Sequence, residues 1–273
     1  MNYWVIVGEG GGFEEVKSIK SNSAAQTSEI VKTTVRMDDI SFTTGGDGKT
    51  KIFICGEEVI KPDVFMLWGH YNEVFEGISR RLTSLGAKVI RVGTLAARES
   101  DGEFQINFLT NNFMGRLRSY GILGCFPYSM LENQVCMGPI DTSCRAFMKL
   151  SRTPKECCVF NAVNNHTLPL GDIILQMNKN GMNIELVEYE EFARALKEAQ
   201  KDPDKAAILS SMTAYMNTAH GKKVVSLPFS SHYTTQILAR TGFFWNASTE
   251  KYVNDFINVL KGFRFFNKDN LNR

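Results

Sequence analysis

The stretch AKVIRVGTLAARESDGEFQINFLTNNFMGRLRSY, from Ala87 to Tyr120, decides the fold. Its first seven residues, through Gly93, form a run that is typical of a buried parallel strand. The polar, glycine-containing segment ESDGEFQINFLTNN follows, and we interpret it as a loop. A helix is predicted from Phe113 to Tyr120. Because loops that follow parallel strands build the binding sites of α/β proteins, we expect functional residues in this loop.

Short β-branched and aromatic runs alternate with helical patterns along the rest of the chain. Strands are predicted at Tyr3–Val7, Lys51–Cys55, Val64–Leu67, Val159–Val163 and Ile184–Val187. Helices are predicted at 71–85, from an Asp141 cap to Leu150, at 172–181, at 190–200, from a Thr234 or Thr235 cap to Gly242, and at 252–260, with a turn at 201–205. The pattern predicts an α/β protein with a parallel-rich Rossmann-like sheet and a small C-terminal α/β subdomain. We expect two regions, 1–90 and 91–273.

Composition and charge exclude several classes of protein. The 273 residues are 43% hydrophobic and 22% charged, and the net charge of +2 gives no field for nucleic acid or an anionic membrane. No apolar run is long enough to span a bilayer and the N-terminus is unlike a signal peptide, so we expect a cytoplasmic protein. The six cysteines form no CxxC pair and the four histidines form no HxxxH or HExxH pair, so we predict no metal site.

Several segments together resemble one enzyme family. They are the stretch Arg91–Glu132, PID at Pro139–Asp141, VFNAVNNH ending at His166, IELVEYEEF at Ile184–Phe192, GFFW at Gly242–Trp245 and RFF at Arg264–Phe266. In this order they are similar to the C-terminal half of the thioester reductase domains that end some nonribosomal peptide synthetases. These domains are extended short-chain dehydrogenase/reductases. The resemblance covers about residues 87–273, with Thr94 in place of the family's usual asparagine.

The resemblance implies the function of this part of the chain. In the family it supplies the last strands of the nucleotide-binding sheet and the subdomain that receives an acyl chain on its phosphopantetheine arm. The family uses NADPH to reduce a carrier-bound thioester and release an aldehyde or alcohol. The implied partner is therefore a peptidyl or acyl carrier protein.

The resemblance also assigns site residues. Gly93 and Thr94 take the positions that border the cofactor, and six residues are implied to face substrate or carrier, namely Arg98, Asp101, Gln105, Asn107, Asp141 and His166. The surface around 91–112 and Pro139–Asp141, with positive charge from Arg98, Arg116 and Arg118, is implied to dock an acidic carrier helix or the phosphate of its arm. The alternative is a solvated loop in which Asp101 caps a turn and the arginines only solvate the surface.

The cofactor and catalytic motifs of the family are missing. A pyrophosphate needs a glycine-rich turn after the first strand, but Gly8 and Gly11 fit only the first two glycines of TGxxGxxG and Glu14 takes the third place. A catalytic tyrosine needs a lysine one helical turn later, but the candidate Tyr71 is followed by Phe75. We therefore predict no catalytic residues, no NADPH bound by this chain and no activity of the chain on its own.

Residues 1–90 have a resemblance of their own. The pattern IFICGEEVIKPDVFMLWGHYNEVFEGISRRLTSLGAKVI, from Ile52 to Ile90, is similar to the N-terminal lobe of ATP-grasp ligases, with Arg91 where an asparagine is expected. Three hypotheses follow. The chain is a thioester reductase remnant, a noncatalytic module that binds a carrier protein or another reductase fragment, or a piece derived from an ATP-grasp ligase.

Overall fold

The computed structural model describes residues 2–8, 13–18, 31–62, 64–68, 73–104, 111–154, 156–216 and 230–266. The chain divides into two compact units. The N-terminal unit holds residues 1–89 and 153–159, and the C-terminal unit holds residues 90–152 and 160–273. Each unit has its own hydrophobic core.

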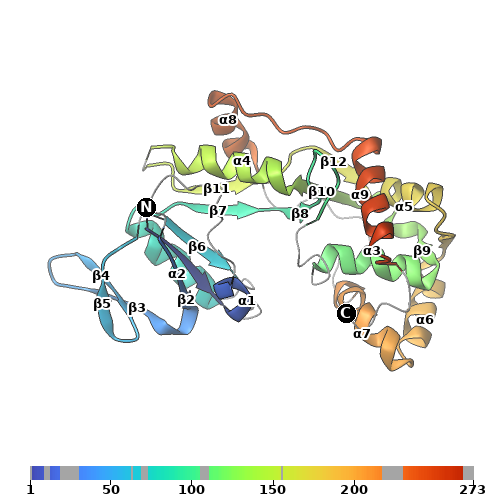
Figure 1. The fold of residues 1–273 in the computed structure, drawn as a ribbon, viewed down its shortest axis with the longest axis horizontal. Coiled ribbons are helices and arrows are strands. Elements are labelled where there is room, and N and C mark those ends of the chain that lie inside the picture. The colour runs from blue at the N-terminus through green and yellow to red at the C-terminus, as the bar shows by residue number, and fades with distance from the viewer. Residues whose placement is uncertain are drawn as a thin grey trace. The chain divides into compact units, whose positions relative to one another are not determined.

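The N-terminal unit is built on a three-stranded parallel sheet in the order β2-β1-β6. Its strands are β1 (Asn2–Val7), β2 (Val31–Arg36) and β6 (Val64–Trp68), and its helices are α1 (Phe13–Ser18) and α2 (Glu73–Ser84) (Figure 1). Ile6 of β1 and Ile78 and Leu82 of α2 belong to one buried cluster. The parallel pairing of β1 with β2 across α1 makes this a βαβ unit.

An antiparallel meander interrupts this α/β pattern. Strands β3 (Ile40–Thr44), β4 (Thr50–Ile54) and β5 (Glu57–Val59) pair in that order. Cys55 and Gly56 connect β4 to β5 with φ values of 50° and 86°. Two residues with positive φ are what a tight hairpin needs, and glycine meets that need at little cost.

The strands of the C-terminal unit form small sheets. Parallel β8 (Thr94–Ala96) and antiparallel β12 (Thr167–Pro169) flank β10 (Gln134–Pro139), and β9 (Cys125–Pro127) pairs in parallel with β13 (Glu185–Val187). Strands β7 (Val89–Val92) and β11 (Val159–Ala162) form a two-stranded sheet. The structure confirms the predicted α/β class with its parallel-rich sheets.

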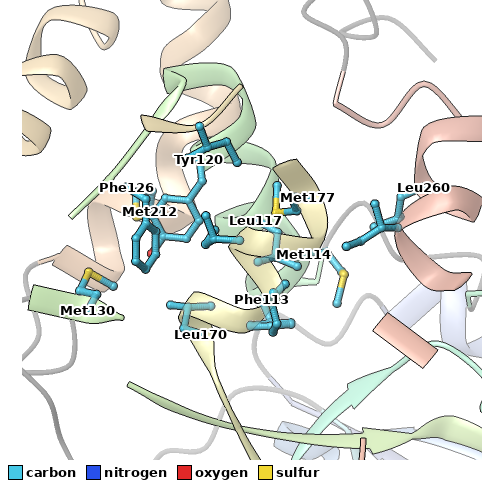
Figure 2. Close-up of a cluster of buried hydrophobic side chains, with 14 of the residues drawn as sticks. Phe113, Met114, Leu117, Tyr120, Phe126, Met130, Leu170, Met177, Met212 and Leu260 are labelled. Atoms are coloured by element: carbon cyan, nitrogen blue, oxygen red, sulfur yellow. The ribbon is translucent and has the colours of Figure 1, made fainter. Parts of the chain in front are cut away.

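Most helices of the C-terminal unit contribute to its core. The helices of this unit are α3 (Asn112–Leu123), α4 (Ile140–Ser151), α5 (Leu170–Lys179), α6 (Tyr189–Ala199), α7 (Pro203–Met216), α8 (His232–Arg240) and α9 (Glu250–Gly262). The core gathers side chains from α3, α5, α7 and α9 with those of β9, and Figure 2 shows Phe113, Leu117 and Tyr120 of α3 inside it. Helix α3 begins where Asn111 Oδ1 accepts hydrogen bonds from two backbone N–H groups, as a good N-cap does.

The predicted strands and most predicted helices are present, but three local predictions are wrong. Pro139, not Asp141, precedes the first residue of α4. The segment 201–205, predicted as a turn, is a turn only over its first two residues; α7 begins at Pro203, because proline has the fixed φ that suits a first helical position. Thr234 lies inside α8, which Ser231 precedes, and its Oγ1 accepts the N–H of Asn161 at 2.8 Å.

Candidate functional site

The loop after β8 is held together by its own charges. Arg98 Nε lies 3.0 Å from Asp101 Oδ1, and Arg98 Nη2 lies 2.7 Å from Asp101 Oδ2 and 2.5 Å from Glu103 Oε2. The N–H of Glu103 donates to Asp101 and is the main cause that lowers the pKa of that carboxyl, with Arg98 adding to it. Arg98 and Asp101, both predicted to face substrate or carrier, therefore pair with each other.

The same loop rests on α9. Gly102 has a φ of 73°, and a Cβ at this position would lie 2.8 Å from the carbonyl carbon of Asp255 and 2.9 Å from the nitrogen of Phe256. Only glycine suits both the backbone conformation and the close approach. Phe104 packs edge-on against Phe256 with ring centroids 5.9 Å apart. The glycine of the DGEF motif is thus explained by packing.

Asp141 and the loop meet in a polar network at the start of α4. Asp141 Oδ1 accepts the backbone N–H groups of Glu99 at 3.0 Å and Thr142 at 2.9 Å. Thr142 Oγ1 donates to Glu99 Oε2 at 2.6 Å, and Asn246 Nδ2 donates to Glu99 Oε1 at 2.7 Å. Asp141 therefore positions the loop relative to α4.

His166 has an exposed ring, and the residue before β12 that organises the backbone is Asn164. The side chain of Asn164 is 1% exposed, and its Nδ2 donates to the carbonyls of Met137 at 3.0 Å and Asn246 at 3.1 Å. Asn164 Oδ1 accepts the N–H of His166 at 2.9 Å. The other two predicted site residues, Gln105 and Asn107, lie outside the described residues.

A cavity of about 350 Å³ opens beside Gly93 and Thr94, the two residues predicted to border the cofactor. Such a volume lies at the lower end of the range for small-molecule sites. The lining combines apolar side chains with a few polar ones, and consists of Val92, Gly93, Thr94, Phe113, Arg116, Leu117, Tyr120, Asn133, Gln134, Val135, Cys136, Leu170 and Tyr215. A mainly apolar hollow with convergent polar groups is typical of an organic ligand site.

Tyr120, one of the residues that line this cavity, carries an unusual polar atom. The residue is 1% exposed, and its hydroxyl has no hydrogen-bond partner among the described residues. Burial raises the pKa of Tyr120, and the nearby Tyr215 raises it further. The hydroxyl is therefore a neutral donor that lacks an acceptor, which is costly in a folded protein unless a ligand supplies one.

Arg116 lies at the same cavity but is held by aromatic rings. Its Cζ is 4.1 Å from the ring centroid of Tyr215 and 5.4 Å from that of Phe113. Arg118 stacks in the same way, 5.3 Å from the centroid of Phe265, and burial lowers its pKa. Both arginines were predicted to face a carrier, but the structure places them against aromatic rings.

Tyr120, Tyr215, Glu99 and Asn164 were not among the residues that the sequence indicated. Tyr120 sits in a helical pattern of apolar residues, where a tyrosine is ordinarily a core residue. Tyr215 belongs to a helix whose start was read as a turn. No spacing in the sequence connects residues so far apart, so only the folded chain brings them together.

The N-terminal βαβ unit has the framework of a dinucleotide site but not its side chains. Its framework fits, since Gly8 follows β1 and the parallel strand β2 ends at Arg36. Its side chains do not fit, because Glu14 places a carboxylate in the first turn of a six-residue helix. Arg36 Nη2 lies 3.5 Å from Glu14 Oε1, and its Cζ lies 4.0 Å from the ring centroid of Phe13. A phosphate beside Glu14 would meet the negative charge of this carboxylate, which Arg36 offsets only in part.

The described part of the chain contains neither a metal-binding cluster nor a membrane-spanning helix. No three His, Cys, Asp or Glu side chains there gather where they could hold a metal ion. None of the helices described has the length and apolar character needed to cross a bilayer. Tyr71, the tyrosine considered for catalysis, lies outside the described residues.

The chain is similar in structure to several solved reductase domains. A thiolation-reductase di-domain from an archaeal non-ribosomal peptide synthetase is 28% identical, with a TM-score of 0.56, and the match covers 71% of this chain and 46% of that one. The terminal R domain from the myxalamid PKS-NRPS biosynthetic pathway is 18% identical, with a TM-score of 0.58, over 70% and 48% of the two chains. The chain thus spans about half the length of these two structures.

A third structure matches nearly the whole chain. The reductase domain of the aureusimine biosynthetic cluster is 13% identical, with a TM-score of 0.60, over 96% of this chain and 91% of that one. At this identity the likeness concerns the fold alone. The resemblance to synthetase reductase domains that the sequence predicted is confirmed, whereas the ATP-grasp resemblance of residues 1–90 stays a prediction.

Neither of two sequence comparisons found a relative. No protein-family model matches the chain. No curated protein matches it.

Proposed function

We propose that the chain is the acyl-binding part of a thioester-reductase-type protein and does not carry out the reduction by itself. The related activity is the NADPH-dependent reductive release of a carrier-bound peptidyl or acyl thioester. The observation that carries the proposal is the cavity beside Gly93 and Thr94, which is lined in part by Tyr120, a residue whose buried hydroxyl has no hydrogen-bond partner among the described residues.

The chemistry of the cavity suits an acyl-pantetheine group. Phe113, Leu117 and Leu170 give apolar walls for an alkyl or side-chain portion, and Gln134 adds an amide. The Tyr120 hydroxyl would donate to a carbonyl oxygen of the thioester or of the pantetheine amides. This hydrogen bond would offset the free energy lost when the hydroxyl is buried away from water. A few such polar contacts fix the orientation of a ligand in a mainly apolar pocket.

The absence of reduction is part of the proposal. NADPH is the cofactor that the reductase resemblance implies, and Glu14 opposes it at the turn after β1. Phe75 stands where the family has the lysine that lowers the pKa of a catalytic tyrosine. Tyr120 is no substitute, because burial raises its pKa and a catalytic proton donor needs a pKa near the working pH.

A carrier protein is the partner we propose for the same site. The reductase neighbour that includes a thiolation domain supports a carrier in coarse terms. We place its arm near the loop 97–104 and Pro139–Asp141, where Glu99, Thr142 and Asn246 form the polar network. Gln105, Asn107 and His166 remain proposed contacts of the arm or the carrier.

The organisation of the chain supports a second candidate, a noncatalytic module that binds a carrier protein or a second reductase fragment. We propose a region 91–273 of reductase type and a region 1–90 of its own. The β3-β4-β5 meander in the N-terminal unit leaves room for few of the βα units of a complete nucleotide-binding sheet. An ATP-grasp origin of this region and a cytoplasmic location also remain predictions.

The test is binding of a stable substrate analogue. An acyl-pantetheine in which an amide replaces the thioester is titrated into the full chain and followed by calorimetry. We expect saturable binding, and we expect Tyr120→Phe to weaken it by about 5–10-fold, since one hydrogen bond contributes about 1 kcal/mol. The control is Tyr252→Phe, because the Tyr252 hydroxyl already donates to the carbonyl of Ala97 at 2.8 Å.

Two results would contradict the proposal. One is the absence of heat and of chemical-shift changes at millimolar analogue. The other is equal binding by wild type and Tyr120→Phe. If the free analogue binds but a carrier protein charged with the same group shows no higher affinity, the cavity stands and the carrier partner is removed.

A further inference from the structure

A second hollow, of about 570 Å³, lies on the C-terminal unit; it shares no lining residue with the Gly93 cavity and shares Asn246 with the polar network at the start of α4. We call it the α4 groove. Its lining residues come from a face of α4 and its C-terminal end on one side and from the turn after α8 on the other. Helices α4 and α8 lie side by side (Figure 1). The groove is lined by Cys144, Arg145, Met148, Lys149, Arg152, Gly242, Phe243, Phe244 and Asn246.

Three cations line up along the first wall. Arg145, Lys149 and Arg152 are spaced four and three residues apart, so they share one side of the helix over about 10 Å. The opposite side of α4 is buried through Ala146 and Leu150. None of the described residues that line the groove is acidic.

The three cations are neutralised to different degrees. Arg145 Nη2 lies 3.7 Å from Glu99 Oε2, so part of its charge is already matched. Lys149 Nζ donates to the carbonyl of Thr241 at 2.7 Å, which orients the ammonium group without cancelling its charge. The exposed Arg152 side chain has no hydrogen bond or ion pair with any described residue. The groove therefore retains positive charge at the C-terminal end of α4.

The second wall adds an exposed aromatic ring in a fixed position. Phe244 is 70% exposed although both neighbours are buried. Those neighbours, Phe243 and Trp245, pack edge-on with ring centroids 5.1 Å apart and anchor the turn. Across the groove Met148 is 50% exposed. An apolar pair inside a cationic rim is the composition of a protein-docking surface.

We propose that the α4 groove binds an acidic amphipathic helix of a protein partner. An apolar side chain of that helix packs between Met148 and Phe244, and its carboxylates face Lys149 and Arg152. The charge pattern selects the partner, because opposite charges steer association and like charges exclude it. This site is separate from the Gly93 cavity and does not depend on the function proposed for that cavity.

The probe for the test is a stapled helical peptide of 14 residues. It carries a central leucine and glutamates at i, i+4 and i+7 on one face, and a matched control peptide has lysine at those three positions. Binding to the full chain is measured by fluorescence anisotropy at 50 and 300 mM salt. We expect the acidic peptide to bind and the lysine peptide not to bind, with affinity falling as salt rises.

Variants separate the two walls. We expect Arg152→Glu and Phe244→Ala each to weaken the acidic peptide at least 5-fold. The matched controls are Arg194→Glu, an exposed cation of α6, and Leu175→Ala, an apolar side chain of α5 that is 52% exposed. Neither control should change the affinity by more than about 2-fold, and circular dichroism should show that all four variants are folded.

Each contrary result overturns the proposal. No binding at 1 mM peptide, equal binding of the lysine peptide, or equal losses with Arg194→Glu would each do so. Binding that inorganic phosphate abolishes at millimolar concentration, and that Phe244→Ala leaves unchanged, would show a site for small anions and not for a helix.

Discussion

Replacing Tyr120 with phenylalanine tests whether the buried hydroxyl is kept for a ligand. In the folded chain this hydroxyl is buried and lacks a partner among the described residues. Folding therefore removes its hydrogen bonds to water and replaces them with none from those residues. The cost of such a group is about 1–3 kcal/mol. Phenylalanine keeps the ring contacts with Phe126, at 4.8 Å, and with Phe192, at 5.9 Å, between ring centroids. Tyr120→Phe should therefore stabilise the protein by about 1 kcal/mol.

Tyr252 provides the matched opposite case. It is 6% exposed, and its hydroxyl donates to the carbonyl of Ala97 at 2.8 Å. Tyr252→Phe removes the hydroxyl and leaves the carbonyl of Ala97 without this hydrogen bond, which should destabilise the protein by about 1–2 kcal/mol. The two substitutions delete the same atom, so the sign of the effect reports only whether the hydroxyl has a partner.

The measurement is urea denaturation of both variants and of the wild type, with the slope of the transition compared to confirm that the same surface unfolds. A gain for Tyr120→Phe, together with weaker binding of the acyl-pantetheine analogue, is expected if the hydroxyl serves a ligand. A loss of stability comparable to that of Tyr252→Phe would refute the reasoning. It would mean that the hydroxyl has a partner within the protein.

Three further predictions follow from the same structure. Gly102→Ala should lower the free energy of unfolding by about 2–4 kcal/mol, because the alanine side chain would strain the backbone and press against α9. Gly181→Ala has a similar φ but open space around it, so the same urea assay should show a loss of about 1 kcal/mol. Equal losses would contradict the contact between Gly102 and α9. Burial raises the pKa of the Cys136 thiol to about 11 from 9.0, so the folded state holds this proton more tightly than the unfolded state. The free energy of unfolding should therefore fall by about 2 kcal/mol between pH 9 and 11. Cys136→Ser should reduce the slope of stability against pH in this range, and an unchanged slope would argue against the burial effect. A fluorescence titration with NADPH should show no saturation near 10 μM, the concentration at which a binding free energy of about 7 kcal/mol gives half-occupancy. Saturation at that concentration would show that Glu14 does not prevent NADPH from binding.

Regular structure could be predicted from the sequence more closely than the candidate site. Apolar periodicity placed α2 and α9 within two residues of their ends, because a helix that buries one face must repeat its apolar residues at helical spacing. It failed at α7, where an Asp-Pro-Asp sequence looks like a turn and is also a good helix start. The cap assigned to Asp141 is wrong because α4 begins at Ile140, one residue before Asp141, and follows Pro139.

What the sequence by itself determined is the α/β class, the order of its strands and helices, and the likeness to reductase domains, since these follow from local periodicity and from motifs read in order along the chain. Only the tertiary structure decided which side chains share a site. It paired Arg98 with Asp101 and placed the guanidinium group of Arg116 against the ring of Tyr215, so each guanidinium group already has a partner within the protein. It also brought Tyr120 to the cavity beside Gly93. Burial and hydrogen-bond partners depend on segments far apart in the chain, and the energies that set the role of a polar group depend on both.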